Sequence, residues 1–87
     1  MNFWDIVAAM AIKDIHKKRL KKFGANLKKI RESKGLSIRE VAAQCDMDFS
    51  KISKLENNNG NITLTTLFEL ADGLDIHPKE LLDFTFE

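Results

Sequence analysis

The 87-residue chain is poor in the residue types that build catalytic and metal sites, with one cysteine, two histidines and no tyrosine. A single cysteine excludes an internal disulfide, which agrees with a reducing cytoplasm. Cys45 falls at an apolar helix position, so we expect buried filler rather than a nucleophile. Neither His16 nor His77 has a second ligand at metal spacing, and no catalytic triad can be assembled. The sequence therefore predicts no enzyme, metal or cofactor.

The chain also lacks an apolar run long enough to cross a membrane, although 44% of its residues are hydrophobic. Its most apolar stretch, residues 2–15, contains Asp5 and lacks a basic start, which argues against a secretory signal. Apolar residues recur there at three- and four-residue spacing, which predicts an amphipathic helix. Nothing breaks this helical pattern between Phe3 and Phe23. The segment is expected either to pack on its own domain or to contact a partner, because exposed Phe3, Trp4, Ile6 and Val7 would form an apolar patch.

Charge is distributed unevenly, although the net charge is only +1. Residues 1–34 carry ten basic and three acidic side chains, whereas residues 35–87 carry four basic and ten acidic ones. Either the two halves simply attract each other, or a cationic face suits DNA phosphates. Lys51 and Lys54 interrupt the acidic half and favour the second interpretation. The basic run at residues 13–22 is expected to be a solvated helix face or a phosphate contact.

Two short helical patterns, separated by a few residues, lie between residues 36 and 57. The first covers residues 38–45, where Ser37 is a natural N-cap and Glu40 completes a capping box. The second covers residues 49–57, with the Asp48 side chain expected to accept from the first-turn amides. So short a turn makes the two helices cross steeply, which is helix-turn-helix geometry.

The second of these helices has a polar outer face. Ile52 and Leu55 mark its buried side, and at about 100° per residue the opposite side carries Ser50, Ser53, Lys54 and Asn57. We expect base-edge contacts from Ser50, Ser53 and Lys54, and backbone contacts from Arg39, Lys51 and Asn57. Phe49, on the flank, either touches a thymine methyl or packs on the domain. Glu56 falls near the core edge and needs a partner.

Helix ends are marked elsewhere as well. Gly35 is expected to end a helix at residues 25–34. Thr63 is placed to cap the next helix, with Gly73 as its stop and Leu64, Leu67, Leu70 and Ala71 as its buried stripe. In the last helix His77 is expected to be the cap and Pro78 the first residue.

Four elements in this order resemble the XRE, or lambda-repressor-like, family: LKKIRESKGLS, REVAAQ, KISKLEN and LTTLFELADGLDIHPKELL. The resemblance covers residues 23–84 and implies an all-α bundle of about five helices. The expected organisation is a domain at residues 23–87, with the helix-turn-helix at about 37–57, preceded by a helical extension at residues 1–22. Two positions depart from the family: Asp46 replaces the usual turn glycine, and Ile38 replaces a phosphate-contacting glutamine.

The resemblance also implies an ion pair between Arg31 and Glu56, and a homodimer formed through the C-terminal end, where Leu82, Phe84 and Phe86 exceed what a small core needs. The loop at residues 57–61 has the length found in restriction-modification controllers but is uncharged. The expected function is a cytoplasmic, sequence-specific regulator that binds a palindrome in double-stranded DNA. Two alternatives stay open. One is an antitoxin-like module that binds a protein partner through its N-terminal segment, and the other is a degenerate helix-turn-helix that no longer binds DNA.

Overall fold

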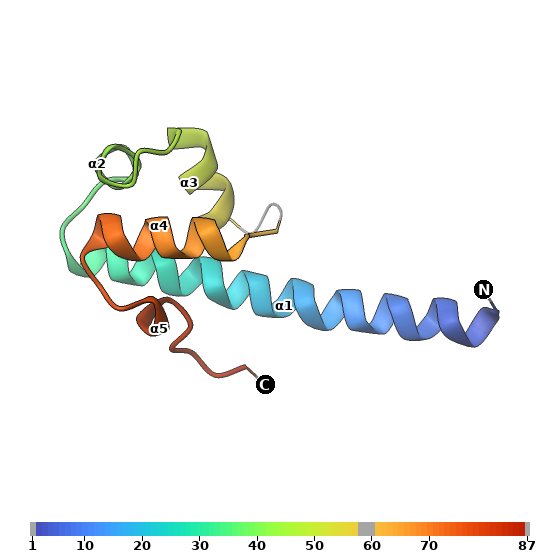
Figure 1. Cartoon of the computed structure of the whole chain (residues 1–87). Coiled ribbons are helices and arrows are strands. Elements are labelled where there is room, and N and C mark those ends of the chain that lie inside the picture. The colour runs from blue at the N-terminus through green and yellow to red at the C-terminus, as the bar shows by residue number, and fades with distance from the viewer. Residues whose placement is uncertain (1, 58–60, 87) are drawn as a thin grey trace.

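The computed structural model describes residues 2–57 and 61–86, and of residues 7–13 it describes the backbone alone. The described residues form five α-helices and no strand, as the sequence predicts (Figure 1). The helices are α1 (Phe3–Ser33), α2 (Ile38–Gln44), α3 (Phe49–Glu56), α4 (Leu64–Leu74) and α5 (Pro78–Leu81). The molecule measures 48 × 25 × 19 Å because α1 extends well beyond the other helices. No helix in the described part of the chain is long and apolar enough to cross a membrane.

Helix α1 joins the N-terminal segment and the first helix of the domain into one element of 31 residues. Asn2 caps its start, where the side-chain oxygen accepts from the Asp5 amide at 2.8 Å. At its end Gly35 takes a φ of 69°, and the amides of Gly35 and Leu36 bond back to the carbonyls of Glu32 and Arg31. This is the Schellman motif, in which one residue adopts the left-handed conformation, and glycine adopts it with the least strain.

The N-terminal part of α1 projects from the domain as a single helix, here called the arm (residues 3–22) (Figure 1). Its described large apolar side chains include Phe3, Trp4, Ile6 and Ile15, which are 68%, 74%, 45% and 41% exposed. Of the two alternatives for this segment, packing on its own domain is therefore wrong for these four residues, and the Val7 side chain lies outside the described residues. A helix leaving a small domain along its own axis has no neighbouring element to cover it.

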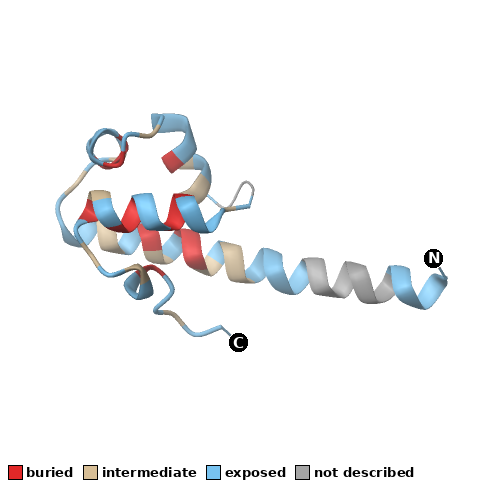
Figure 2. Ribbon diagram, in the orientation of Figure 1, coloured by how far each residue is buried: buried red, intermediate tan, exposed pale blue. Residues whose placement is uncertain are grey.

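The core lies where α1, α2, α3, α4 and α5 meet (Figure 2). Its largest fully buried side chains are Leu27, Val41, Ile52, Leu70, Leu74 and Leu81. Cys45 is also buried, and its thiol donates to the Leu70 carbonyl at 3.8 Å. Burial raises the pKa of the Cys45 thiol, which agrees with the predicted packing role rather than a nucleophilic one.

Two expectations for α4 are wrong. Leu64 is 69% exposed instead of buried, because it is the first residue of the helix and faces away from the core stripe of Leu67, Leu70, Ala71 and Leu74. Gly73 does not stop the helix, which continues to Leu74, and Asp75 takes the left-handed position at φ 55°. A Cβ on Gly73 would lie 2.8 Å from Cα and 3.0 Å from the backbone nitrogen of Cys45. Glycine is needed there for close helix packing, not for a turn.

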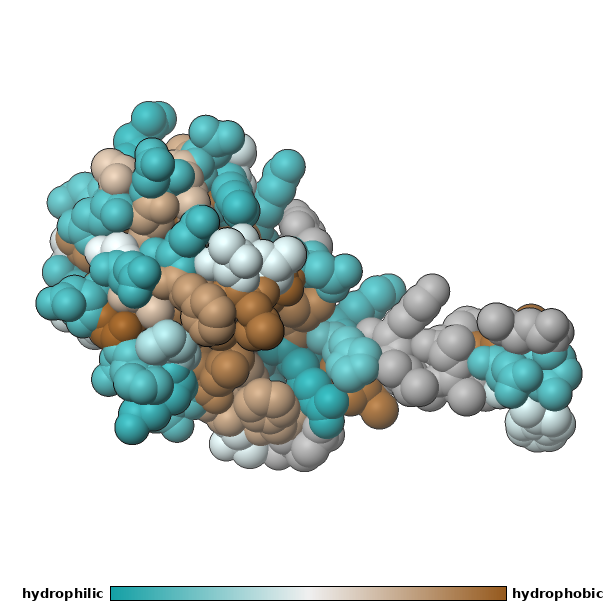
Figure 3. Space-filling model, in the orientation of Figure 1, coloured by the Kyte–Doolittle hydropathy of each residue, from teal (hydrophilic) through white to brown (hydrophobic). Residues whose placement is uncertain are grey.

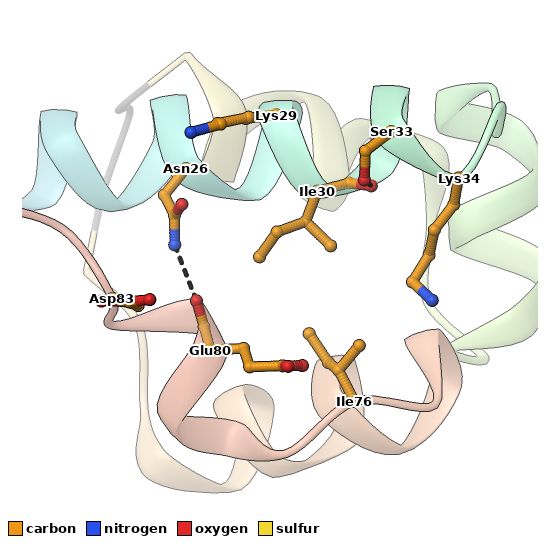
Figure 4. A pocket seen from close by; sticks show the side chains of 8 residues that line it. All are labelled: Asn26, Lys29, Ile30, Ser33, Lys34, Ile76, Glu80 and Asp83. Carbon is orange, nitrogen blue, oxygen red and sulfur yellow. Dashed lines mark hydrogen bonds between the residues drawn. The ribbon is translucent and has the colours of Figure 1, made fainter.

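Helix α5 is held against α1 by side-chain to backbone hydrogen bonds. Asn26 on α1 donates to the Glu80 carbonyl at 2.9 Å (Figure 4) and to the Leu81 carbonyl at 3.0 Å. The predicted cap is present, because His77 Nδ1 accepts from the Lys79 amide at 3.1 Å and Pro78 occupies the first turn. Beyond α5, Lys22 Nζ donates to the Thr85 carbonyl at 2.7 Å, so the C-terminal segment returns to the base of the arm.

Candidate nucleic-acid interface

Hydrogen bonds between neighbouring residues define the unit formed by α2, the turn and α3. Ser37 Oγ accepts from the Glu40 amide and Glu40 Oε1 accepts from the Ser37 amide, both at 3.1 Å, which is the predicted capping box. The hydrogen bond from the Ser37 amide, together with the nearby Ser37 hydroxyl, lowers the pKa of the Glu40 carboxyl. The turn then closes at Asp46, whose φ is 54°, with the Met47 amide bonded to the Ala42 carbonyl at 2.9 Å. Aspartate therefore occupies the left-handed position where the family usually has glycine.

Asp48 only partly meets the sequence expectation. It has the extended backbone of an N-cap, but its side chain makes no capping hydrogen bond to α3. Asp48 is one of the residues that line a groove between α3 and the start of α4. The prediction that this carboxylate accepts from the first-turn amides is wrong in this structure. Asp48 is exposed, so water can satisfy these amides in its place.

Helix α3 buries Ile52 completely and presents the opposite side to solvent. The structure places Ser50, Lys54 and Asn57 at exposed positions and Ser53 at a half-buried one. Asn57 Nδ2 donates to the Ser53 carbonyl at 2.9 Å and to Ser53 Oγ at 3.3 Å. That leaves the Ser53 hydroxyl proton and the Asn57 amide oxygen available to a ligand. The predicted polar outer face is present as a continuous surface.

A groove of about 460 Å³ runs along one side of this face. Its lining residues are Asp48, Ser50, Lys51, Lys54, Leu55, Asn61, Thr63 and Thr66. Thr63, the N-cap of α4, was not singled out as a ligand contact from the sequence, whereas Asn61 belongs to the uncharged loop at residues 57–61. A loop residue and a helix cap carry no periodic signal that would connect them with α3. Residues 58–60 of this loop lie outside the described residues.

On the other side of the face, α2 and α3 present a mixed pair of side chains. Arg39 Cζ lies 4.9 Å from the centroid of the Phe49 ring. Phe49 is 44% exposed, and Arg39 is exposed as well. Of the two roles expected for Phe49, packing against the domain is thus realised in part, since one contact of the ring is with an arginine of the neighbouring helix.

The orientation of α3 is fixed by the ion pair that the family resemblance implies. Arg31 donates from Nε to Glu56 Oε2 at 2.6 Å and from Nη2 to Glu56 Oε1 at 3.0 Å. Its Nη1 donates to the Leu36 carbonyl at 2.8 Å, so one guanidinium connects α1, α3 and the segment before α2. The two side chains are 12% and 4% exposed. The hydrogen bond to Glu56 raises the pKa of Arg31.

A further residue that positions α3 was missed from the sequence. A Cβ on Gly24 of α1 would lie 2.5 Å from the Leu55 carbonyl oxygen and 2.6 Å from that of Glu56. The end of α3 therefore packs directly on the α1 backbone. An isolated glycine inside a helical pattern is the signal that could have indicated this close approach.

A capped α2, a tight turn and an α3 with one buried and one polar face define a helix-turn-helix protein. A family model described as helix-turn-helix matches residues 27–81, and the chain belongs to this family, as the XRE-like motifs predict. The first 26 residues, which include the arm, lie outside this match.

The relatives include control proteins of similar length. Control protein C.BamHI from Bacillus amyloliquefaciens is 36% identical over 64 residues, covering 72% of this chain and 79% of the relative. Control protein C.MunI from Mycoplasma sp is 41% identical over 61 residues, covering 69% and 82%. Among solved structures, the restriction-modification controller protein C.AhdI from Aeromonas hydrophila has a TM-score of 0.69 at 39% identity, covering 71% of this chain and 94% of that chain.

Proposed function

We propose that the protein is a transcriptional regulator, not an enzyme, that binds double-stranded DNA sequence-specifically in the cytoplasm. The observation that carries this proposal is the exposed polar face of α3, held on a helix-turn-helix whose relatives are control proteins. Helix α3 enters the major groove, where Ser50, Ser53 and Lys54 reach base edges. Lys51 and Asn57 contact the backbone on either side. The similarity to C.BamHI and C.AhdI favours the controller type of regulator.

A homodimer would bind two half-sites about one helical turn apart. Figure 3 shows apolar side chains gathered from α4 toward the C-terminal segment. The exposed large apolar side chains of α4 and the C-terminal segment, here called the α4 patch, are Leu64, Phe68, Leu82 and Phe86. Exposed apolar surfaces of this kind mark protein contacts. We propose that a second copy of the chain covers the α4 patch.

A second candidate function is suggested by the arm. Phe3 and Trp4 contact each other with ring centroids 5.4 Å apart and are otherwise largely open to solvent. They also lie outside the part of the chain that the family model matches. DNA binding by α3 does not use them, so they suit a protein partner of the kind that an antitoxin neutralises.

Sedimentation analysis of two variants distinguishes these two surfaces. Phe68→Ser changes the α4 patch, and Phe3→Ser is the matched control in the arm, since both replace an exposed phenylalanine. If the α4 patch forms the dimer, Phe68→Ser gives a monomer and Phe3→Ser leaves the dimer unchanged. The reverse pattern would assign self-association to the arm. Co-isolation of a stoichiometric second protein, lost on deletion of residues 2–15, would support the partner-binding function.

DNA binding itself is tested by selection from a random duplex pool at low and near-physiological salt. Phosphate contacts weaken steeply with salt, whereas base contacts determine which sequence is enriched. Enrichment of one palindromic site at both salts is the expected result. Unselective binding that disappears at the higher salt would contradict the proposal and favour a degenerate helix-turn-helix.

A further inference from the structure

The position of Arg39 in α2 does not stabilise the helix. It is the second residue of α2, and a cation in the first turn is disfavoured by the helix dipole. In the part of the chain that the structure describes, it forms no ion pair, because Glu40 beside it is engaged with Ser37. Its contact is with the Phe49 ring, at 4.9 Å.

This contact leaves the hydrogen-bonding capacity of Arg39 intact. An aromatic ring attracts a cation placed over its face, without using the N–H groups of the guanidinium. The five donors of an arginine lie in the plane of that group, in a fork that matches two neighbouring acceptors. The Phe49 ring also restricts the orientations of the Arg39 guanidinium, so less conformational entropy is lost when a ligand binds.

The location of the pair is at the base-contacting end of the recognition helix. Phe49 is the first residue of α3, and the N-terminal residues of such a helix contact base edges in the major groove. Guanine presents O6 and N7 there as adjacent acceptors, which an arginine fork binds in a bidentate manner. A phosphate contact would need no such alignment.

We propose that Arg39 and Phe49 form one guanine-reading unit, in which Arg39 binds guanine O6 and N7 and Phe49 is the residue that positions its guanidinium. This replaces the backbone contact that the sequence suggests for Arg39. It rests on the proposed DNA-binding function and adds a specificity determinant from α2 to those of α3.

The test uses the full chain and the duplex that the wild type selects from a random pool. Binding is measured for the wild type, Arg39→Ala, Arg39→Lys, Phe49→Ala and Phe49→Leu, with Lys79→Ala as a control that removes an exposed cation on α5. Each guanine of the half-site is replaced in turn by 7-deazaguanine, which lacks the N7 acceptor. Both target side chains are exposed, so unchanged thermal unfolding shows that the variants fold.

The expected result is a single guanine at which 7-deazaguanine weakens wild-type binding about fivefold to tenfold and leaves Arg39→Ala unaffected. Arg39→Ala weakens binding about tenfold to hundredfold and relaxes selection at that position alone. The Arg39→Lys variant retains the positive charge but loses the preference for guanine at that position. Phe49→Ala and Phe49→Leu both lose part of the guanine preference, since neither supplies a ring.

Three results overturn the inference in different ways. If Arg39→Ala weakens binding evenly across sequences and lowers the salt dependence, Arg39 contacts phosphate, and the proposed function stands. If both Phe49 variants keep the full guanine preference, Arg39 reads the base without Phe49. If the wild type selects no site at all, the proposed function itself fails.

Discussion

Replacement of Glu56 by alanine is expected to destabilise the protein severely. The Glu56 side chain is 4% exposed and accepts two hydrogen bonds from Arg31, at 2.6 and 3.0 Å. Its removal leaves the guanidinium, 12% exposed, with the Leu36 carbonyl as its remaining partner. Leaving one charge of a buried pair uncompensated costs about 3–5 kcal/mol. For a domain of this size, about 4–8 °C of melting temperature is lost per kcal/mol.

The assay is urea unfolding followed by far-UV circular dichroism at fixed protein concentration. Fluorescence would be a poor reporter, because Trp4, the single tryptophan, lies in the exposed arm. Glu40→Ala is the matched control, since Glu40 is also a helix carboxylate but is exposed. The double variant Arg31→Met/Glu56→Met should recover most of the loss, because a buried ion pair adds little over apolar packing. Equal free-energy losses for Glu56→Ala and Glu40→Ala would refute this reasoning.

Three other predictions follow from single contacts. Gly73→Ala should lower the free energy of unfolding by about 1–3 kcal/mol, because the added Cβ clashes with the Cys45 backbone. The further substitution Cys45→Ala should not restore this stability. Full restoration would contradict the prediction and show that the Cys45 thiol alone limits the packing. The lowered pKa of Glu40 contributes stability that is present above its ordinary pKa of 4.5 and is lost as the pH falls through the folded-state value. The free energies of unfolding of the wild type and of Glu40→Gln should therefore become equal in acid. A difference between them that stays constant from pH 7 to 3 would contradict this assignment. Lys54→Ala should weaken DNA binding by about 1–3 kcal/mol and relax one base preference, measured by anisotropy on variant duplexes; an even loss on all duplexes would assign Lys54 to phosphate.

Signals confined to a few neighbouring residues predicted much of this fold. The capping box of Ser37 and Glu40, the glycine at 35 and the cap at Thr63 all depend on hydrogen bonds within one helical turn, and all three are present. The polar face of α3 also followed from periodicity, because Ile52 marks its buried side.

Contacts between helices could not be predicted in the same way. The sequence position of Gly73 suggests a helix stop. The residue is glycine because Cys45, the C-cap residue of α2, packs where a Cβ would lie. Asp48 has the backbone of an N-cap but makes no capping hydrogen bond, which its residue type does not reveal. The Arg39–Phe49 pair joins two helices, so the periodicity of neither one reveals it. The Arg31–Glu56 pair was expected only from the family resemblance, although an acid near a core edge indicated that a partner was needed.

The central claim is that the outer face of α3 reads DNA sequence. Its most direct test is parallel selection from one random duplex pool by the wild type and by the variant Ser53→Ala/Lys54→Ala, with equal helicity confirmed beforehand. We expect the wild type to enrich a palindromic site and the variant, which is folded but altered on this face, to lose or change that preference. Enrichment of the same site by both proteins would contradict it and place recognition elsewhere on the chain.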